Sequence, residues 1–296
     1  MAKRLRHVTI VGVGLLGGSV AMGLKRAYGG IHVAGVGRRQ SSLDEALGVG
    51  AIDSAHLDVA ECVGRSDLVV LCTPVGAFGD YLLKIKPLLK TSAIVTDVGS
   101  TKREVVGMAA AILGRKANFV GSHPMAGSET KGVRFARADL LCGATCIVTP
   151  AAATPAPAVR FIQQMWKKLG MRVVQMDPRR HDQAVAAISH LPHALSALLM
   201  LMPKGPQMDV AAGGFRDMTR LAGGDSEMWR DIFATNRRPI LDAIDSFQRR
   251  LLALRESVER GELTAIETLL DEARLRRSEF VTGRKDCPPA RPKGRG

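Results

Sequence analysis

The chain has 296 residues, of which 46% are hydrophobic and only 4% aromatic, so it can form two modest domains with aliphatic cores. Its net charge of +14 is spread along the sequence. A nucleic-acid-binding protein usually gathers such charge on one face, so we interpret it as a basic solvated surface that attracts anionic substrates. The five cysteines are scattered without a CxxC pair, which argues against a zinc site or disulfide framework and fits a cytoplasmic protein.

The N-terminus imitates a signal peptide. Three basic residues precede an uncharged run over 8–24, but several glycines fall inside that run and would weaken a signal-peptide helix. No other run reaches the ~18 apolar residues that span a bilayer. We therefore expect a soluble protein whose first strand begins at His7.

Residues 1–178 alternate between short β-branched runs and helical patterns. This alternation is typical of βαβ units and predicts a Rossmann-like α/β domain with a parallel sheet. The predicted strands are His7–Val11, His32–Val36, Leu68–Cys72, Ala93–Asp97, Phe119–Gly121, Thr145–Thr149 and Arg172–Gln175. The Ala-, Thr- and Pro-rich stretch 150–157 resembles a linker, but a helix over Ala158–Leu169 and another strand follow it. The domain boundary is therefore placed at 178.

Residues 179–282 contain no convincing strand, and we predict an all-α domain there, followed by a disordered basic tail over 283–296. One apolar helix spans His181–Met202. A second helix carries apolar residues at alternating spacings of three and four. That stripe consists of Ile240, Ile244, Phe247, Leu251, Leu254 and Val258. Gly261 separates it from a similar stripe over Leu263–Leu275. Such stripes form intrachain core or a dimer seam, and the pattern favours neither.

A glycine-rich turn follows the first strand directly. Residues 12–17 match GxGxxG between a strand and a helix, the context in which the motif indicates a dinucleotide site. Gly12 allows the tight turn, Gly14 lets the backbone approach a pyrophosphate, and Gly17 lets the helix pack on the strand. Leu15 and Leu16 begin that helix, whose free N–H groups attract the pyrophosphate. We also assign Thr73 and Pro74, which follow the third strand, to cofactor binding.

The second strand ends without the acidic residue that usually binds the ribose 2′-hydroxyl of NAD. Gly37 lies where that acid is expected, and Arg38, Arg39 and Ser41 follow it. Guanidinium and hydroxyl groups can hold a 2′-phosphate. The loop therefore favours NADP over NAD, with NAD left as the alternative.

Polar residues follow three predicted strands at the edge where Rossmann ligands bind. They occupy 72–75, 97–102 and 121–129. Within the last segment, His123 is well placed to take a proton from a hydroxyl as hydride leaves its carbon.

A second polar set interrupts the helical half. His190 and His193 are three residues apart and share a helix face, as a metal pair or a substrate-facing pair. We favour substrate and expect no metal site, because no carboxylate-plus-His pattern lies nearby. Farther on, Arg216 and Arg220 flank Asp217 at a glycine-marked helix start, an arrangement that suits a carboxylate ligand.

Six motifs occur in a fixed order. They are GLLGGS at Gly14–Ser19, DVGSTK at Asp97–Lys102, SHPMAGSE at Ser122–Glu129, HLPH at His190–His193, GGFRDMTR at Gly213–Arg220 and MWRDIF at Met228–Phe233. Together they make the chain resemble the prephenate/arogenate dehydrogenase family of tyrosine biosynthesis, from about His7 to Phe280. The resemblance implies NAD(P)-dependent oxidative decarboxylation of prephenate to 4-hydroxyphenylpyruvate, or of arogenate to tyrosine. It also implies a homodimer formed through the helical half.

The resemblance also assigns roles to residues. His123 matches the catalytic histidine that hydrogen-bonds the ring C4 hydroxyl, and Ser100 matches the serine that aligns this hydroxyl. The remaining matches are substrate-binding positions. His193 matches one of them, Arg220 matches an arginine that holds a carboxylate, and Asp217 matches the acid near that arginine. Glu129 and Trp229 match residues that line or gate the pocket. The chain departs from the wider family in lacking the acid after the second strand, and we expect neither a fused chorismate mutase nor a regulatory module.

Two rival functions remain at this point. A β-hydroxyacid-type dehydrogenase shares the outline but uses a catalytic lysine on its second domain. A non-catalytic nucleotide- or nucleic-acid-binding protein would exploit the basic charge, and salt-dependent DNA binding without turnover would support it. The sequence does not decide between prephenate and arogenate.

Overall fold

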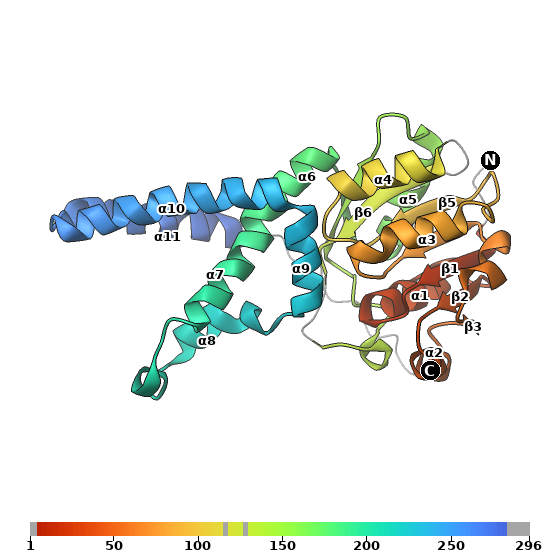
Figure 1. Cartoon of the computed structure of the whole chain (residues 1–296), viewed down its shortest axis with the longest axis horizontal. Coiled ribbons are helices and arrows are strands. Elements are labelled where there is room, and N and C mark those ends of the chain that lie inside the picture. The colour runs from red at the N-terminus through yellow and green to blue at the C-terminus, as the bar shows by residue number, and fades with distance from the viewer. Residues whose placement is uncertain (1–4, 115–117, 127–129, 283–296) are drawn as a thin grey trace. The chain divides into compact units, whose positions relative to one another are not determined.

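The computed structural model describes residues 5–114, 118–126 and 130–282. The chain divides into two compact units, Met1–Ile240 and Leu241–Gly296 (Figure 1). The first unit extends beyond residue 178, where we placed the domain boundary. Asp182 and Thr235 are hydrogen-bonded to Lys102 and Thr101, which lie at the edge of the sheet. The predicted tail over 283–296 lies outside the described residues.

One sheet organises the first unit. Among the described residues its strand order is β3-β2-β1-β4-β5-β6-β7-β8. The strands are β1 His7–Val11, β2 His32–Val36, β3 Ser54–His56, β4 Leu68–Leu71, β5 Ile94–Asp97, β6 Asn118–Pro124, β7 Thr145–Pro150 and β8 Arg172–Gln175. The chain order reverses between β1 and β4, which is where dinucleotides bind in such sheets.

The α/β class is confirmed, with two corrections to the sheet. The short strand β3 was missed, since three half-buried residues carry no readable alternation. The predicted parallel sheet is confirmed with one exception, since β7 runs antiparallel to β6, while β8 is parallel to β7. The sixth strand also continues past its expected end at Gly121, so that His123 lies within β6, opposite Ile147.

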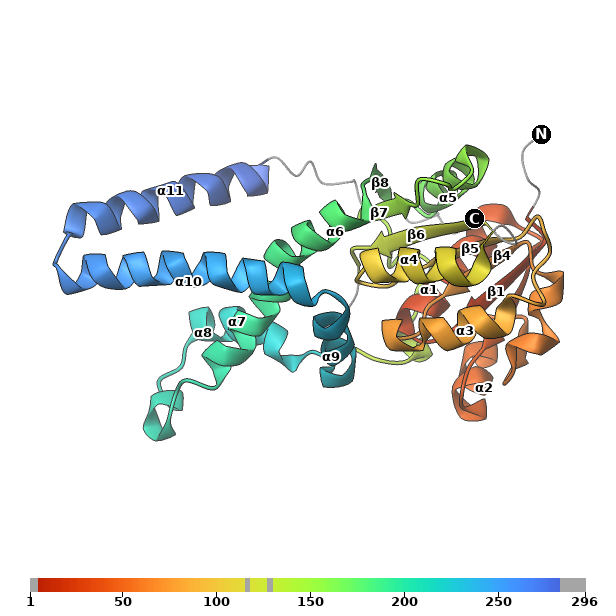
Figure 2. The ribbon, with the colours of Figure 1, turned by 45° about the horizontal axis from the view of Figure 1, so that its top comes forward.

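Helices cover both faces of the sheet (Figures 1 and 2). They are α1 Leu15–Tyr28, α2 Gln40–Gly48, α3 Phe78–Ile85, α4 Arg103–Leu113 and α5 Ala156–Lys168. Alternate strand residues face opposite layers, as the period of two requires. Ile10 and Val70 join the cluster that contains α1 and α5, whereas Val69 and Leu71 join the cluster that contains α3 and α4. The central strands β1 and β4 are therefore buried on both faces.

The predicted helix over His181–Met202 is divided. It consists of α6 Pro178–Val185, a π-helical turn Ala186–His190 and α7 Leu191–Met200. The widened turn lies just before Pro192, which has no N–H to continue regular α-helical bonding. By length and composition alone the stretch Pro178–Met200 could also cross a membrane, contrary to our expectation that no run after the first would qualify. The core helix of a soluble protein passes the same test.

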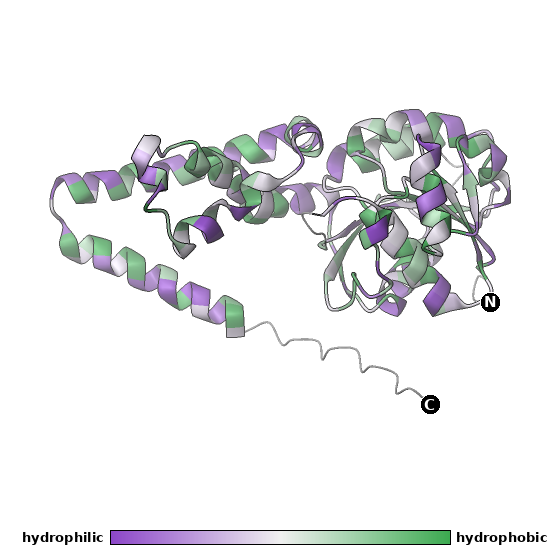
Figure 3. Cartoon of the chain, turned by 90° about the horizontal axis from the view of Figure 1, so that it is seen from below, coloured by the Kyte–Doolittle hydropathy of each residue, from purple (hydrophilic) through white to green (hydrophobic). Residues whose placement is uncertain are grey.

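The remaining helices are α8 Gly213–Thr219, α9 Ser226–Thr235, α10 Arg237–Glu259 and α11 Leu263–Thr282. The second unit contains most of α10 and all of α11, joined at Gly261, whose φ is +67°. No residue of α11 is buried, although hydrophobic residues recur along it (Figure 3). Among the described residues, the apolar stripe expected over Leu263–Leu275 is therefore not buried. The stripe on α10 is buried at Ile240, partly buried at Ile244, Phe247 and Leu254, and exposed at Leu251 and Val258.

The glycine turn shows why two of its positions tolerate no side chain. Gly12 has a φ of +96°, and a Cβ there would lie 2.8 Å from the backbone of Cys72. A Cβ on Gly17 would lie 2.1 Å from the carbonyl oxygen of Gly12. A Cβ on Gly14 would meet nothing within 4 Å. Gly12 and Gly17 thus permit close packing of β1, α1 and β4, whereas Gly14 leaves open space.

We predict that Gly17→Ala lowers the free energy of unfolding by about 1–3 kcal/mol, the usual cost of overpacking. Alanine is the better helix former by about 1 kcal/mol, but contact with a fixed carbonyl oxygen outweighs that gain. Gly14→Ala, the matched control, should cost less than about 1 kcal/mol. Urea unfolding at one protein concentration measures both. Equal stability of the two variants would contradict this account of the turn.

Candidate active site

A cleft of about 580 Å³ opens at the switch point between β1 and β4. Of the predicted cofactor residues, Gly12, Gly14, Arg38, Arg39, Thr73 and Pro74 line it. Leu15, Leu16, Gly17 and Ser41 do not contribute to its lining, and Ser42 does so where we expected Ser41. Leu15 begins α1, directly after Gly14.

The features of the cleft fit a dinucleotide. The open space beside Gly14 lies at the start of α1, where free N–H groups favour a pyrophosphate. The Thr73 hydroxyl belongs to the lining and is buried without a hydrogen-bond partner among the residues that the structure describes. A buried hydroxyl in this state is stabilised once a ligand bonds to it. Glu45, in α2, lines the same cleft and is an acid that the sequence interpretation did not consider.

A buried ion pair supports the loop after β5. The Lys102 ammonium contacts a carboxylate oxygen of Asp97 at 2.5 Å, and both side chains are fully buried. Asp97 also accepts the backbone N–H groups of Gly99 and Ser122. A buried charge pair needs such additional hydrogen bonds to offset its desolvation. The pair therefore holds the loop that carries Ser100, which is half-buried, against the strand that carries His123.

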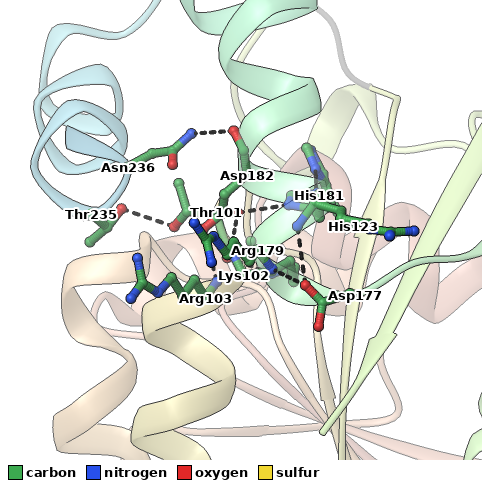
Figure 4. Close-up of polar contacts among 12 residues, drawn as sticks. Thr101, Lys102, Arg103, His123, Asp177, Arg179, His181, Asp182, Thr235 and Asn236 are labelled. Atoms are coloured by element: carbon green, nitrogen blue, oxygen red, sulfur yellow. Dashed lines mark hydrogen bonds and ion pairs between the residues drawn. The ribbon is translucent and has the colours of Figure 1, made fainter. Parts of the chain in front are cut away.

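His123 is the first member of a buried chain of polar contacts (Figure 4). Its Nδ1 lies 2.9 Å from Nε2 of His181, and Nδ1 of His181 lies 2.7 Å from Oδ1 of Asp182. Asp182 in turn accepts the backbone N–H groups of Lys102 and Arg103 at 2.8 and 2.9 Å. Helix α6 is thereby attached to the start of α4.

The pKa of His123 lies well below its ordinary value of 6.5. Burial is the main cause, because it disfavours the charged imidazolium. Neighbouring His181, Lys102 and His190 lower it further. The ring is therefore neutral at physiological pH, the form in which a histidine acts as a base.

The HLPH histidines converge on Trp229 of α9. The rings of His193 and Trp229 are stacked, with centroids 3.5 Å apart and planes at 11°, and His190 meets the same indole edge-on. Asn236 donates to Nδ1 of His190 and to the backbone carbonyl of Asp182. Burial holds the pKa of His190 at about 4. The two histidines thus share a helix side, as expected, but have different surroundings.

The other predicted substrate residues lie nearer to solvent. Asp217 in α8 is exposed, as is Arg220, which follows α8 and begins the turn Arg220–Gly223. Ser196 of α7 accepts the backbone N–H of Ala222 and so holds this turn against α7. Glu129 lies outside the described residues.

Several residues of the site were missed in the sequence. His181, Asp182 and Asn236 are at most 1% exposed and bond directly or indirectly to His123. The adjacent pair His181-Asp182 opens an apolar helix just after Asp177-Pro178. A polar pair in that position was the same kind of signal that drew attention to HLPH.

Comparison with known proteins agrees with both halves of this description. A family model described as the nucleotide-binding domain of prephenate dehydrogenase matches residues 20–175. A second, described as its dimerization domain, matches residues 177–272. The chain belongs to the prephenate dehydrogenase family. It is accordingly an oxidoreductase that uses NAD or NADP.

Individual relatives resemble the chain over most of its length. The solved structure of prephenate dehydrogenase from A. aeolicus, in complex with hydroxyphenyl propionate and NAD+, superposes with a TM-score of 0.88 at 33% identity, covering 95% of this chain and all of that one. A cyclohexadienyl dehydrogenase of Zymomonas mobilis subsp. mobilis is 34% identical, covering 86% of this chain and 88% of the relative. A prephenate dehydrogenase of Bacillus subtilis is 33% identical, covering 96% and 78%.

The lowered pKa of His123 predicts the pH dependence of catalysis. A base works in its neutral form, so kcat/KM should be constant above pH 6.5 and should fall only at more acidic pH. Steady-state rates measured across pH show this acidic limb, the part of the profile in which kcat/KM falls. His123→Gln should lower kcat by about 10²–10⁴ at neutral pH and abolish the limb. A midpoint above the ordinary histidine value in the wild-type enzyme would contradict the environment described for His123.

Proposed function

We propose that the chain is a prephenate dehydrogenase that converts prephenate to 4-hydroxyphenylpyruvate in tyrosine biosynthesis. The observation that carries the proposal is a buried, neutral His123 on β6, two strands away from β4 in the sheet. The residues that directly follow β4, Cys72, Thr73 and Pro74, line the dinucleotide cleft. A proton acceptor beside a dinucleotide site is what oxidation of a secondary ring alcohol requires, because the carbinol carbon gives up a hydride as the hydroxyl loses its proton. The similarity to prephenate dehydrogenases supports prephenate as this alcohol.

The side chains have separable tasks in this reaction. When bound, the oxidised nicotinamide supplies the hydride acceptor. His123 accepts the proton of the C4 hydroxyl, and Ser100 aligns that hydroxyl. Carbon dioxide leaves the opposite ring carbon, and formation of the aromatic ring drives the carbon–carbon cleavage. The protein therefore has to supply orientation, one base and fixed charges.

Arg220 is proposed to hold a substrate carboxylate, with Asp217 beside it. His193 and Trp229 form a flat wall through their stacked rings. A Cβ on Gly224 would lie 2.6 Å from atoms of both rings, so the backbone at Gly224 packs directly against the two stacked rings. Glu129 is proposed to line the same pocket. A guanidinium binds carboxylates with two parallel hydrogen bonds, which fixes orientation as well as charge.

We predict that Arg220→Ala raises the KM for prephenate far more than it lowers kcat, because the carboxylate is present in both the ground and the transition state. Arg220→Lys should restore part of the loss, since a point charge replaces a bidentate fork. Arg249→Ala, an exposed arginine of α10, is the control and should leave both constants unchanged. An unaltered KM in both Arg220 variants would remove this residue from the substrate site.

For the cofactor, NADP is proposed to be used better than NAD, with NAD still functional. Arg38 and Arg39 line the cleft after β2, and no carboxylate ends that strand. Ser42 lies on the cleft and can donate to a phosphate. Glu45 opposes this preference, and both arginines are exposed, so the preference should be moderate rather than absolute.

Arg38→Ala should reduce the ratio of kcat/KM for NADP to that for NAD by about tenfold. That is the expected effect of losing one partly exposed, charge-assisted hydrogen bond to the 2′-phosphate. Arg26→Ala, an exposed arginine of α1 away from the cleft, should leave the ratio unchanged. Gly37→Asp is a less clean test, because its Cβ would lie 3.1 Å from the buried Leu43. A wild-type enzyme that prefers NAD would show that the two arginines serve only as solvated charges.

A homodimer formed through the helical region is also proposed, in the cytoplasm. Leu263 and Leu270 of α11 are 75% and 60% exposed, and Leu251 and Val258 of α10 are 53% and 60% exposed. Leu198 and Leu201, at the end of α7, are 61% and 78% exposed. Apolar rows of this kind in a region that matches a dimerization domain are best explained by a second copy.

Arogenate is the second candidate substrate, favoured by the similarity to a cyclohexadienyl dehydrogenase. Steady-state rates with prephenate and with arogenate, each with NAD and NADP, test the proposal. Higher kcat/KM with arogenate would make the chain an arogenate dehydrogenase, and turnover of neither would refute the assignment.

A further inference from the structure

The contacts behind His123 determine where the protons of three side chains lie. Two neutral imidazoles that meet at 2.9 Å through single nitrogen atoms share one proton, so one ring must donate and the other must accept. The identity of the donor decides whether His123 can act as a base through its other nitrogen. That identity follows from the surroundings of Asp182.

Both oxygens of Asp182 are committed to accepting hydrogen bonds. The backbone N–H of Lys102 donates to Oδ1, and the backbone N–H of Arg103 donates to Oδ2. Backbone amides cannot reverse this role. The Nδ1 atom of His181, 2.7 Å from Oδ1, must therefore carry a proton and donate it to the carboxylate.

The remaining assignments follow in sequence. A neutral imidazole with its proton on Nδ1 has a lone pair on Nε2. Nε2 of His181 thus accepts, and Nδ1 of His123 donates. Nε2 of His123 then has no proton and is available as an acceptor. We propose that His181 and Asp182 are positioning residues that hold His123 in the Nδ1–H tautomer, the only neutral form able to take a proton through Nε2.

The reverse arrangement is unfavourable on this geometry. If His181 donated from Nε2, its Nδ1 lone pair would face the Asp182 carboxylate at 2.7 Å without a proton between them. A doubly protonated His181 would avoid that repulsion. Burial opposes it, because desolvation is the main cause that lowers the pKa of His181.

The same contacts favour the reacting state over the resting state. When His123 takes up the hydroxyl proton, its Nδ1–H becomes a charged donor, and its bond to His181 strengthens. The Asp182 carboxylate, one ring farther on, opposes the new positive charge. Interactions that strengthen during the reaction raise kcat rather than substrate affinity. The inference rests on the proposed role of His123 as the base.

Nitrogen-15 NMR of enzyme labelled at its seven histidines reads the tautomer directly and needs no variant of the network. The His123 signals are identified by their loss in His123→Gln. In the wild-type enzyme we expect a protonated Nδ1 and an unprotonated Nε2 for both His123 and His181. A proton on Nε2 of His123 at neutral pH would overturn the inference.

Two substitutions of His181 test the consequence for turnover. His181→Leu removes the acceptor, and kcat should fall about 10²–10⁴-fold, as for a base in the wrong tautomer. His181→Gln can present its amide oxygen to the His123 N–H and should stay within about tenfold of wild type. KM for prephenate and the Kd of the dinucleotide should change less than about threefold in both, because neither ligand contact is removed.

His32→Leu, at an exposed histidine of β2, is the matched control and should leave kcat unchanged. Thermal unfolding shows whether each variant is folded. Equal kcat in His181→Leu, His181→Gln and the wild type would refute the positioning role. Failure of the proposed function appears differently, as absence of prephenate turnover in the wild-type enzyme, and leaves the measured tautomer unaffected.

Discussion

The carboxylate of Asp182 is the interaction on which the site depends. It joins α6 to the first turn of α4 and to the ring of His181, while Asn236 binds the backbone carbonyl of the same residue. Except for the partly buried backbone N–H of Arg103, these groups are buried, so each buried one left without a partner would cost about 1–3 kcal/mol. Helix α6 is thereby held to the segment that follows β5, Asn236 is held to α6, and His123 on β6, the proposed base, contacts this network through His181.

A buried ion pair, Asp97 with Lys102, lies at the same edge of the sheet. Asp97, at the end of β5, binds Lys102 and the backbone of the β6 residue next to His123. This pair and the Asp182 contacts share the segment Thr101–Arg103, which lies between β5 and α4. Removing one partner of such a pair leaves an uncompensated buried charge. The reacting groups are therefore set by a polar network beneath them rather than by flexible surface loops.

This arrangement of His123, the dinucleotide cleft and the basic residues suits a reaction that is driven by the substrate's own aromatisation. Loss of carbon dioxide restores an aromatic ring, so the enzyme needs a proton acceptor, an oriented dinucleotide and charges for two carboxylates. His123, the proposed base, suits the first requirement, because burial and the neighbouring His181 and Lys102 lower its pKa. The glycine turn and the Thr73 hydroxyl meet the second. The basic character of the chain favours approach of a dianionic substrate.

The sequence by itself determined what depends on local pattern. Strand–helix alternation gave the α/β class, the GxGxxG turn gave the dinucleotide cleft, and SHPMAG with HLPH and FRDMTR indicated the family. The tertiary structure alone decided what depends on contacts between distant residues. The antiparallel β7, the extension of β6 through His123 and the exposure of α11 belong to this group. So does the chain from His123 to His181 and Asp182, which joins residues 58 positions apart. Periodicity records only which face of an element is apolar, whereas the partner of a buried polar group is set by packing.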